Sequence, residues 1–439
     1  MQASLGNSGT RVFQTLTYDP VTRRVANSVI ARESNNPGAL SNIRYTYDPV
    51  GNVTRIRDDQ NDGTIPDDQC FAYDWAMRLT EAWTTGDACA TKPAADGSAG
   101  PNLGTVDPYW TSWTLTDTGQ RATETQHKAG PVTADTMRTS AYPGTTGAAQ
   151  AHGVRSVTAT GGATGTDTYA YDATGNLVKK APSDGSAQDL TWNEEGKLAS
   201  STIAGATTTF LYDPEGTRIL KREPTATTLY LPGGQEITLT KSTNSLTGTR
   251  YYSVPGGTAV RTSADGQVRL LIADHHGTNQ LSVNASTLSF NRRKSLPYGG
   301  QRGAAPFSWP GKKGFVGGDI DPTTGLTHIG AREYDTSLGQ FISVDPVFAI
   351  DAPQSLNGYA CADNSPVTLS DPTGLCAEPG CPTRPCPNCE NTTPGQEPGK
   401  PKLTEVGQRV GGGRDRDDGP PRRRSSKSVS YVVRRTSRL

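Results

Sequence analysis

Polar and apolar residues alternate with a period of two along much of the chain, and short turns interrupt the alternation. The run Arg44-Tyr45-Thr46-Tyr47 alternates in this way, as a half-buried β-strand does. Residues 207–212 and 218–222 are two further runs, separated by a turn that contains Gly216. We predict that these two runs are the arms of one hairpin, and that the chain is all-β and built from many such hairpins.

One turn sequence recurs at the ends of these runs. Its three clearest copies are Tyr47-Asp48-Pro-Val-Gly51-Asn52, Tyr171-Asp172-Ala-Thr-Gly175-Asn176 and Tyr212-Asp213-Pro-Glu-Gly216-Thr217. Weaker copies begin at Tyr18, Tyr73 and Trp192, and residues 86–151 are less regular, with one irregular repeat around Asp117-Thr-Gly-Gln120. An Asp side chain that bonds to nearby backbone, followed by a Gly that accepts positive φ, closes a hairpin. The aromatic-Asp pairs are therefore interpreted as structural.

The repeat length determines how the hairpins must be assembled. Tyr171, Trp192 and Tyr212 follow one another at intervals of 21 and 20 residues. A unit of about 20 residues cannot bury a core alone, so neighbouring units must join into one extended sheet.

Composition supports a globular protein with many turns. Of the 439 residues, 33% are hydrophobic, 49 are Gly and 31 are Pro, which is close to ordinary globular usage. No apolar run approaches the ~18 residues of a membrane span. The first ten residues do not resemble a signal peptide, so we expect either export by another route or a fragment of a longer protein, with a sheet that is incomplete at its N-terminal end.

Residues 311–375 carry no repeat but a dense series of short motifs. They include Gly330-Ala-Arg332-Glu-Tyr-Asp335, Gln340-Phe-Ile-Ser-Val-Asp345-Pro346 and Asp371-Pro-Thr-Gly374-Leu375. Asp-Pro and Asp-Pro-X-Gly are also common turn sequences, so these motifs alone do not establish catalysis. Asp321, Asp335 and Asp351 are interpreted as turn residues.

The repeats and this motif series together resemble the rearrangement-hotspot (Rhs) family of YD-repeat proteins. Relatives of that family are the C components of insecticidal toxin complexes, and teneurins share the architecture. The resemblance implies YD-repeat hairpins that wind into a spiral β shell over residues 1–310, and an Rhs-associated core over 311–375 that closes the shell. The series departs from the family at Gln340, where most relatives have Arg, and at Thr217, which replaces the usual turn Asn.

The same resemblance implies a single intramolecular cleavage. In the relatives the core cuts its own chain after the Asp-Pro-X-Gly-Leu motif, which places the cut between Leu375 and Cys376. The catalytic aspartates map onto Asp345 and Asp371, and the supporting arginine maps onto Arg332. Two neighbouring carboxylates resist ionising together, so one holds a proton while the other can activate water. We therefore expect at most a single-turnover aspartyl-type autoprotease that needs no cofactor.

The variable tail, residues 376–439, occupies the position at which Rhs proteins carry a toxin. From Lys400 to Leu439 it holds 12 Lys or Arg and 4 Asp or Glu, and its composition predicts disorder. We therefore expect a truncated toxin, with contact to nucleic acid only through this basic tail. Cys376, Cys381, Cys386 and Cys389 have four thiols but long spacings, so a Pro-rich linker with free thiols is favoured over a zinc site or disulfides.

The remaining candidates are weaker. His275-His276 lies in a turn and lacks further ligands for a metal, and Cys70, Cys89 and Cys361 are scattered and indicate no disulfide framework across the chain.

Two functions remain in view. The first is a secreted or cell-surface toxin carrier that encapsulates its own C-terminal segment, with an immunity protein and secretion machinery as partners. The alternative is a non-catalytic cell-surface or carbohydrate-binding YD-repeat protein. The two differ in whether the chain is cut after Leu375.

Overall fold

The computed structural model describes residues 1–375 except 34–37, 94–101, 130–132, 144–149 and 348–352. Within these ranges, 24 strands follow one another in a single sheet, and each strand pairs antiparallel with the next along the chain. The all-β prediction is thus confirmed. No helix in the described ranges is long and apolar enough to cross a membrane.

The strands of this sheet are β1 (Gln2–Leu5), β2 (Val12–Tyr18), β3 (Val25–Arg32), β4 (Ala39–Tyr47), β5 (Val53–Gln60), β6 (Ile65–Tyr73), β7 (Leu79–Thr84), β8 (Trp110–Leu115), β9 (Arg121–Gln126), β10 (Thr136–Ala141), β11 (Ser156–Gly161), β12 (Gly165–Tyr171), β13 (Leu177–Ala181), β14 (Gln188–Trp192), β15 (Leu198–Ile203), β16 (Ala206–Tyr212), β17 (Arg218–Arg222), β18 (Ala226–Leu231), β19 (Gln235–Thr240), β20 (Ser245–Val254), β21 (Gly257–Thr262), β22 (Val268–Ala273), β23 (Asn279–Asn284) and β24 (Phe290–Arg292). The predicted hairpin of residues 207–222 is β16 and β17.

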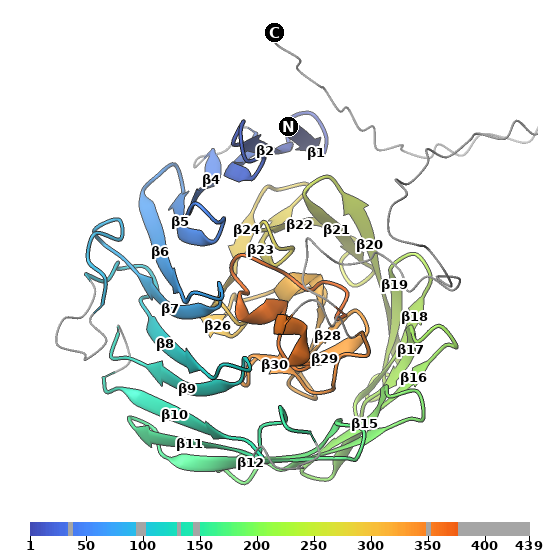
Figure 1. Cartoon of the computed structure of the whole chain (residues 1–439). Coiled ribbons are helices and arrows are strands. Elements are labelled where there is room, and N and C mark those ends of the chain that lie inside the picture. The colour runs from blue at the N-terminus through green and yellow to red at the C-terminus, as the bar shows by residue number, and fades with distance from the viewer. Residues whose placement is uncertain (34–37, 94–101, 130–132, 144–149, 348–352, 376–439) are drawn as a thin grey trace, which may run out of the picture. The chain divides into compact units, whose positions relative to one another are not determined.

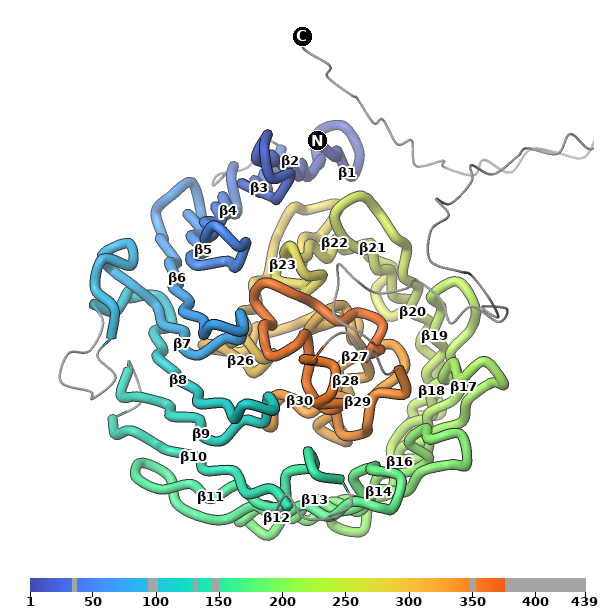
Figure 2. Tube along the Cα trace, in the orientation of Figure 1, coloured from blue at the N-terminus to red at the C-terminus, as the bar shows by residue number. Residues whose placement is uncertain are grey.

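The sheet forms a curved wall around the segment that follows it (Figure 1). The trace in Figure 2 shows that the wall bends until its last strands lie beside its first ones. Leu5, Val12 and Leu40 of the first strands pack in one buried cluster with Ile272 and Leu281 of the last strands. Burial of these apolar side chains stabilises the closure.

The recurring turn has one geometry, which β4 and β5 illustrate. Asp48 Oδ1 accepts the backbone N–H groups of Gly51 at 2.6 Å and Asn52 at 2.8 Å, and Gly51 has φ 109°. A β-bulge precedes the turn, because Thr46 pairs with Arg55 but Tyr47 pairs with Val53. The carboxylate and the glycine thus fix a turn whose bulge increases the local twist.

Several aromatic residues of the repeat reach back to the preceding turn, although the buried hydroxyl of Tyr171 makes no such bond. The hydroxyl of Tyr47 donates to the Val25 carbonyl at 2.8 Å, and Tyr73 donates to the Val53 carbonyl at 2.8 Å. Further along, the Trp192 indole N–H donates to the Leu177 carbonyl at 2.7 Å. Each acceptor is the first residue of the strand that follows an earlier turn, so these bonds join successive hairpins along one rim of the wall.

Two further turns share this geometry without the repeat sequence. Leu115-Thr116 takes the place of Tyr-Asp between β8 and β9, where Thr116 Oγ1 accepts the Gln120 N–H at 3.1 Å. Ala273-Asp274 takes the place of Tyr-Asp between β22 and β23, where Asp274 Oδ1 accepts the Thr278 N–H at 2.9 Å. The irregular repeat around Asp117 is therefore a regular turn with other residues at its aromatic position.

The chain after the wall lies inside it (Figure 1). It forms the small pair β25 (Lys294–Ser295) and β26 (Gln301–Arg302), the meander β27 (Asp319–Asp321), β28 (Leu326–Ile329), β29 (Arg332–Asp335) and β30 (Gln340–Phe341), and the 3₁₀ turns η1 (Phe315–Gly317), η2 (Pro353–Leu356) and η3 (Ala362–Asn364). We refer to residues 311–375 as the inner segment. Leu326 and Ile342 of this segment are buried in one cluster with Leu177 and Phe210 of the wall.

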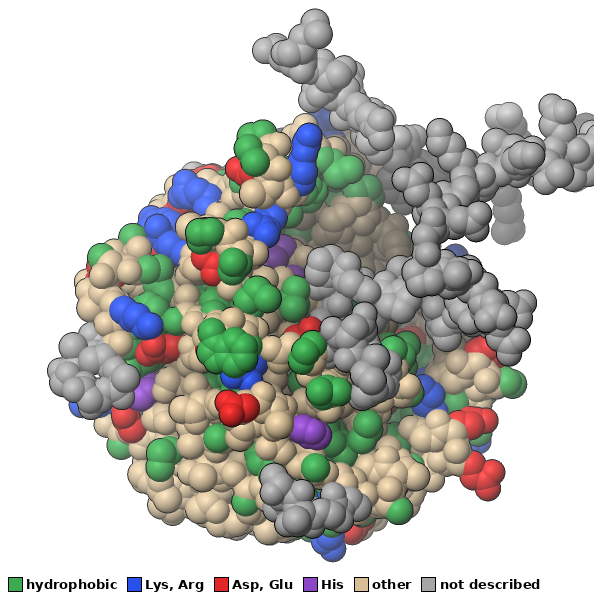
Figure 3. All heavy atoms as spheres, viewed as in Figure 1, with side chains coloured by type: hydrophobic (Ala, Val, Ile, Leu, Met, Phe, Trp, Pro, Cys, Tyr) green, Lys and Arg blue, Asp and Glu red, His purple; other side chains and the backbone are tan. Residues whose placement is uncertain are grey.

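The two faces of the wall differ because side chains alternate along each strand. Phe210 points to the inner segment and is buried, whereas its neighbour Leu211 is 49% exposed. In the space-filling view, charged side chains lie mostly toward the margin of the face in sight (Figure 3). The face of the wall that the inner segment leaves uncovered is called the outer face below.

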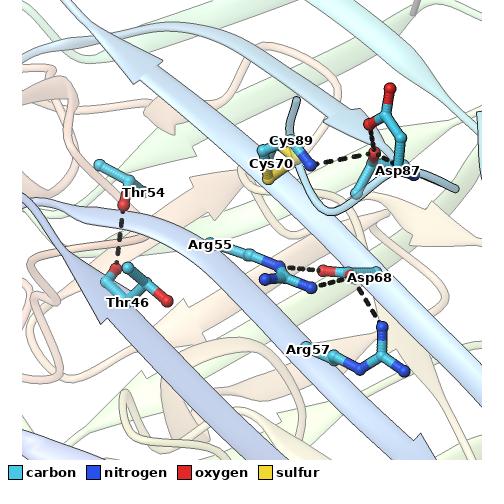
Figure 4. Close-up of a disulfide and its surroundings, with 9 residues drawn as sticks. Thr46, Thr54, Arg55, Arg57, Asp68, Cys70, Asp87 and Cys89 are labelled. Carbon is cyan, nitrogen blue, oxygen red and sulfur yellow. Dashed lines mark hydrogen bonds and ion pairs between the residues drawn. A yellow bond between two sulfur atoms is a disulfide. The ribbon is translucent and has the colours of Figure 1, made fainter. Parts of the chain in front are cut away.

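Cys70 and Cys89, which the sequence leaves scattered, form a disulfide with a Cα–Cα distance of 5.9 Å (Figure 4). Cys70 lies in β6, and Cys89 lies in the loop that follows β7. Trp83 and Trp110 pack beside the two sulfurs in one cluster of the wall. This pair could not be predicted from the sequence, because the loop must fold back over β6 before the two thiols meet.

Reduction of this disulfide is expected to destabilise the wall by about 3 kcal/mol, because closing a loop of about 20 residues restricts the unfolded chain by that order. Urea denaturation with and without reductant measures the effect. The double variant Cys70→Ala/Cys89→Ala serves as control and should be insensitive to reductant. An unchanged unfolding midpoint in the reduced wild type would contradict the prediction.

Candidate active site

Arg332 is the centre of a buried polar cluster in the inner segment. It is the first residue of β29, its side chain is 3% exposed, and its guanidinium lies 3.7 Å from the centroid of the Phe341 ring. Nη1 donates to the Gly358 carbonyl at 2.8 Å, and Nε donates to the Gly374 carbonyl. These bonds fix the guanidinium plane between two stretches of backbone.

The remaining nitrogen of Arg332 holds both predicted aspartates. Nη2 lies 2.7 Å from Asp345 Oδ2 and 3.2 Å from Asp371 Oδ2. The structure therefore brings together Arg332, Asp345 and Asp371, which the sequence separates by up to 39 residues. One guanidinium thus lies between two carboxyl groups. Paired carboxyl groups in proteins can differ in protonation, so that one acts as an acid and the other as a base.

Asp371 also closes the turn that ends at Leu375. Its Oδ1 accepts the Leu375 N–H at 3.0 Å and the Thr373 hydroxyl at 3.2 Å. Gly374 has φ 65°, and a Cβ there would lie 2.3 Å from the Ile329 carbonyl oxygen, so only Gly fits this turn. The backbone of Leu375 is thus held directly by the Asp371 side chain. Cys376 and the other zinc candidates, Cys381, Cys386 and Cys389, lie outside the described residues.

The environment of Asp345 changes its protonation. Burial raises its pKa to about 6, although Arg332 and the Val347 N–H, 2.8 Å from Oδ1, favour the charged form. A carboxylic acid that still carries its proton at mildly acidic pH can donate it during a reaction.

A third carboxylate, Asp363, belongs to the same cluster and was missed by sequence reasoning. It lies in η3 with φ 52°, between Ala362 and Asn364, which also have positive φ. Burial, and then the charge of Asp371, raise the pKa of Asp363. No motif marks this residue, and a run of three non-glycine residues with positive φ has no sequence signature.

A cavity reaches Asp363 at the margin of this cluster. Asp363 and Ser370 line a cavity of about 560 Å³ whose other walls include Val50, Met77 and His276. The cavity therefore opens between the turns of the wall and the inner segment.

Cys361 is a poor nucleophile despite its position. It is 1% exposed and unpaired, and burial, followed by the charge of Asp371, raises the pKa of its thiol well above the usual range. The thiol stays protonated, whereas attack requires the thiolate.

The turns of the wall hold the inner segment in place. The Gly119 carbonyl accepts hydrogen bonds from Asn357 Nδ2 at 2.8 Å and Asn364 Nδ2 at 3.0 Å. The Gly175 carbonyl accepts one from the Tyr359 hydroxyl at 2.7 Å. Each of these carbonyls belongs to a glycine in a hairpin turn, so the rim of the wall positions the backbone that carries Asp345 and Asp363.

His275 and His276 take part in the same contacts. His275 Nε2 lies 3.0 Å from the Val367 carbonyl, and burial lowers the pKa of His275 to about 4 and that of His276 to about 3. Among the described residues, no group of His, Cys, Asp and Glu is arranged to hold a metal. The two histidines are thus neutral packing residues.

The acidic residues that the sequence places in turns form ion pairs with the wall. Asp335 bonds to Lys180 at 2.6 Å and Asp321 bonds to Lys221 at 3.1 Å. Asp351 lies outside the described residues.

The stability of the folded chain should report the protonation of Asp345. The pKa of Asp345 is raised on folding, so its contribution to the free energy of unfolding is complete below about pH 4 and is lost as the pH rises through about 6. Urea denaturation at pH 4 to 7 should show this loss in the wild type and its absence in Asp345→Asn. Parallel curves for the two proteins would contradict the prediction.

Comparison with known proteins agrees with the fold. No family model matches the sequence. The toxin subunit YenC1 of Yersinia entomophaga is 26% identical over 415 aligned positions, which cover 84% of this chain and 40% of YenC1.

Two solved structures share the fold. The crystal structure of TcdB2-TccC3 without its hypervariable C-terminal region matches 83% of this chain with a TM-score of 0.63 and 22% identity. A Tc holotoxin pore of Photorhabdus luminescens matches the same share with a TM-score of 0.57 and 22% identity. The chain covers 18% of each of these solved chains. The repeated turns, the single antiparallel wall and the likeness to a toxin subunit support the relation of the chain to Rhs/YD-repeat proteins and to the C components of toxin complexes.

Proposed function

We propose that the chain is a toxin carrier whose β wall surrounds a C-terminal segment and releases it by one cleavage after Leu375. The observation that carries the proposal is the position of Asp371, which bonds to Arg332 through Oδ2 and to the Leu375 N–H through Oδ1. A carboxylate of the pair thus contacts the residue that bears the scissile carbonyl.

The proposed reaction divides the work between the two aspartates. Asp371 accepts hydrogen bonds on both oxygens, which hold its carboxyl group in place beside Leu375. It takes a proton from a water molecule whose oxygen attacks the Leu375 carbonyl carbon. Asp345 gives its proton to the leaving nitrogen, and the Leu375–Cys376 bond breaks to leave a carboxylate and a new N-terminal amine.

Arg332 and the intramolecular position of the substrate also favour the proposed reaction. The guanidinium keeps the two carboxyl groups in place and stabilises the negative charge that develops beside them. The substrate is part of the same chain, so no binding step is needed. The product tail leaves the turn, and the reaction therefore occurs once per molecule.

The carrier role rests on likeness and on position in the chain. The relative YenC1 is named a toxin subunit, and residues 376–439 follow the proposed cut. The disulfide supports a secreted or cell-surface location, because such bonds persist in oxidising compartments. An immunity protein and secretion machinery are the proposed partners, and carbohydrate binding belongs to the non-catalytic alternative.

The intact mass of the purified protein tests the cleavage. Wild type should give two masses that sum to the 46.5 kDa chain plus one water, with the new N-terminus at Cys376. Asp345→Asn and Asp371→Asn should slow the appearance of the fragments at least 100-fold, the usual worth of acid–base catalysis.

Asp335→Asn is the matched control, because Asp335 is buried on β29 but bonds to Lys180 rather than to Arg332. It should be cut as the wild type is. A wild type that remains one chain, or fragments that form equally in both catalytic variants, would overturn the proposal and leave a non-catalytic wall.

A further inference from the structure

The outer face of the wall carries a second constellation of reactive side chains. Ser112 lies in β8, His127 directly follows β9, and Asp135 directly precedes β10. Ser112 Oγ lies 2.8 Å from His127 Nε2, and His127 Nδ1 lies 3.1 Å from Asp135 Oδ2. A hydroxyl, an imidazole and a carboxylate in this order form the arrangement that activates a serine nucleophile.

The strand register places these residues away from the inner segment. Cys70, Trp83 and Trp110 are directly opposite one another across β6, β7 and β8, so they share one face with the disulfide. Ser112 is two residues after Trp110 and therefore points to the same face. Its neighbour Trp113 points the other way and packs against Tyr298 of the inner side. The constellation is thus separate from Asp345 and Asp371.

The imidazole is held in a defined orientation. The Trp110 ring stacks on it with centroids 3.7 Å apart and an angle of 18°, and Trp110 is itself fixed by a bond from its indole N–H to Glu81 Oε1 at 2.8 Å. The His127 side chain is 12% exposed. Packing therefore prevents the ring from turning away from Ser112.

The carboxylate sets the tautomer. The backbone N–H of Lys128, 2.6 Å from Asp135 Oδ1, lowers the pKa of Asp135, and His127 lowers it further. An ionised carboxylate only accepts hydrogen bonds, so Nδ1 of His127 carries the proton. Nε2 then presents its lone pair to the Ser112 hydroxyl, as a general base must.

Other hydroxyl groups on exposed parts of the wall have a different environment. Thr114 bonds to Thr123, Thr191 to Ser200 and Thr202 to Thr207, each pair at 2.6 to 2.9 Å. Such cross-strand pairs stabilise a sheet but contain no base. At Ser112 the hydroxyl instead meets an imidazole that a carboxylate orients.

A buried donor without a partner lies on the same face. Among the described residues, the Trp83 indole N–H is buried without a hydrogen-bond partner. Trp83 stands opposite Trp110 and diagonally across from Ser112, whose own partner on β7 is Glu81. A buried donor without an acceptor is costly unless a ligand supplies one.

From this geometry we propose that Ser112, His127 and Asp135 form a second active site, which hydrolyses small acyl esters. The Ser112 oxygen bonds to the acyl carbon while its proton passes to His127 Nε2, and the ester C–O bond breaks as the alcohol takes that proton. Water then attacks the acyl-serine and gives its proton to His127. The carboxylic acid leaves, and the proton returns to Ser112.

Labelling with diisopropyl fluorophosphate tests this site in the full chain. The wild type should gain one phosphoryl group, located on Ser112 by peptide mass spectrometry, and should hydrolyse p-nitrophenyl acetate. Ser112→Ala should lose both activities, and His127→Asn should lower the labelling rate at least 100-fold. Ser200→Ala, which removes a hydroxyl of a cross-strand pair, should react as the wild type does.

The unfolding midpoint of each variant shows whether the wall is intact, and the serine labelled in wild type is identified without any variant. Absence of labelling in the wild type, labelling at another residue, or labelling of Ser112 that does not depend on His127 would overturn the proposal.

Discussion

The wall depends on one hydrogen bond that recurs from hairpin to hairpin, in which an aromatic side chain at the end of a strand donates to the first carbonyl after an earlier turn. Tyr47, Tyr73, Trp192 and Tyr212 all make this bond, at 2.7 to 3.0 Å. The bond is absent at Tyr171 and at the turns of Leu115 and Ala273. Where it occurs it opposes a slip of one residue, which would expose the apolar face of the sheet. The bond therefore sets both the register of the hairpins and the line of turns along the rim.

The candidate active site is a consequence of that rim. The carbonyls of Gly119 and Gly175 become available to Asn357, Asn364 and Tyr359 because the turns place them on the inner side. The inner segment contributes Arg332 from a strand, but Asp345 and Asp371 come from irregular stretches of chain. Such stretches keep one conformation only when their surroundings determine it. The wall thus functions as the scaffold that brings the two carboxylates to one guanidinium.

The sequence predicted those features that depend on neighbouring residues. The turn requires only an Asp and a Gly three residues after it. The hairpins and the all-β fold were therefore predicted correctly. The turns at Leu115 and Ala273 were predicted only as an irregular repeat and as a turn, because the backbone adopts the geometry of the repeat there without an aromatic residue. The Cys70–Cys89 disulfide, Asp363 and the contact of Ser112 with His127 could not be predicted, since each depends on how distant segments fold together. For Arg332, Asp345 and Asp371, the family resemblance supplied what local sequence did not.

The most direct test of the dependence of the site on the rim is the cleavage rate of the full chain with Asn357→Ala and Asn364→Ala combined, measured by intact mass. These changes remove both bonds to the Gly119 carbonyl and leave Arg332, Asp345 and Asp371 unaltered. Our account predicts a cleavage rate at least tenfold below that of the wild type, because a displacement of the reacting groups by about 1 Å lowers a rate by about that much or more. The unfolding midpoint of the wall should be retained. Cleavage at the wild-type rate would contradict it.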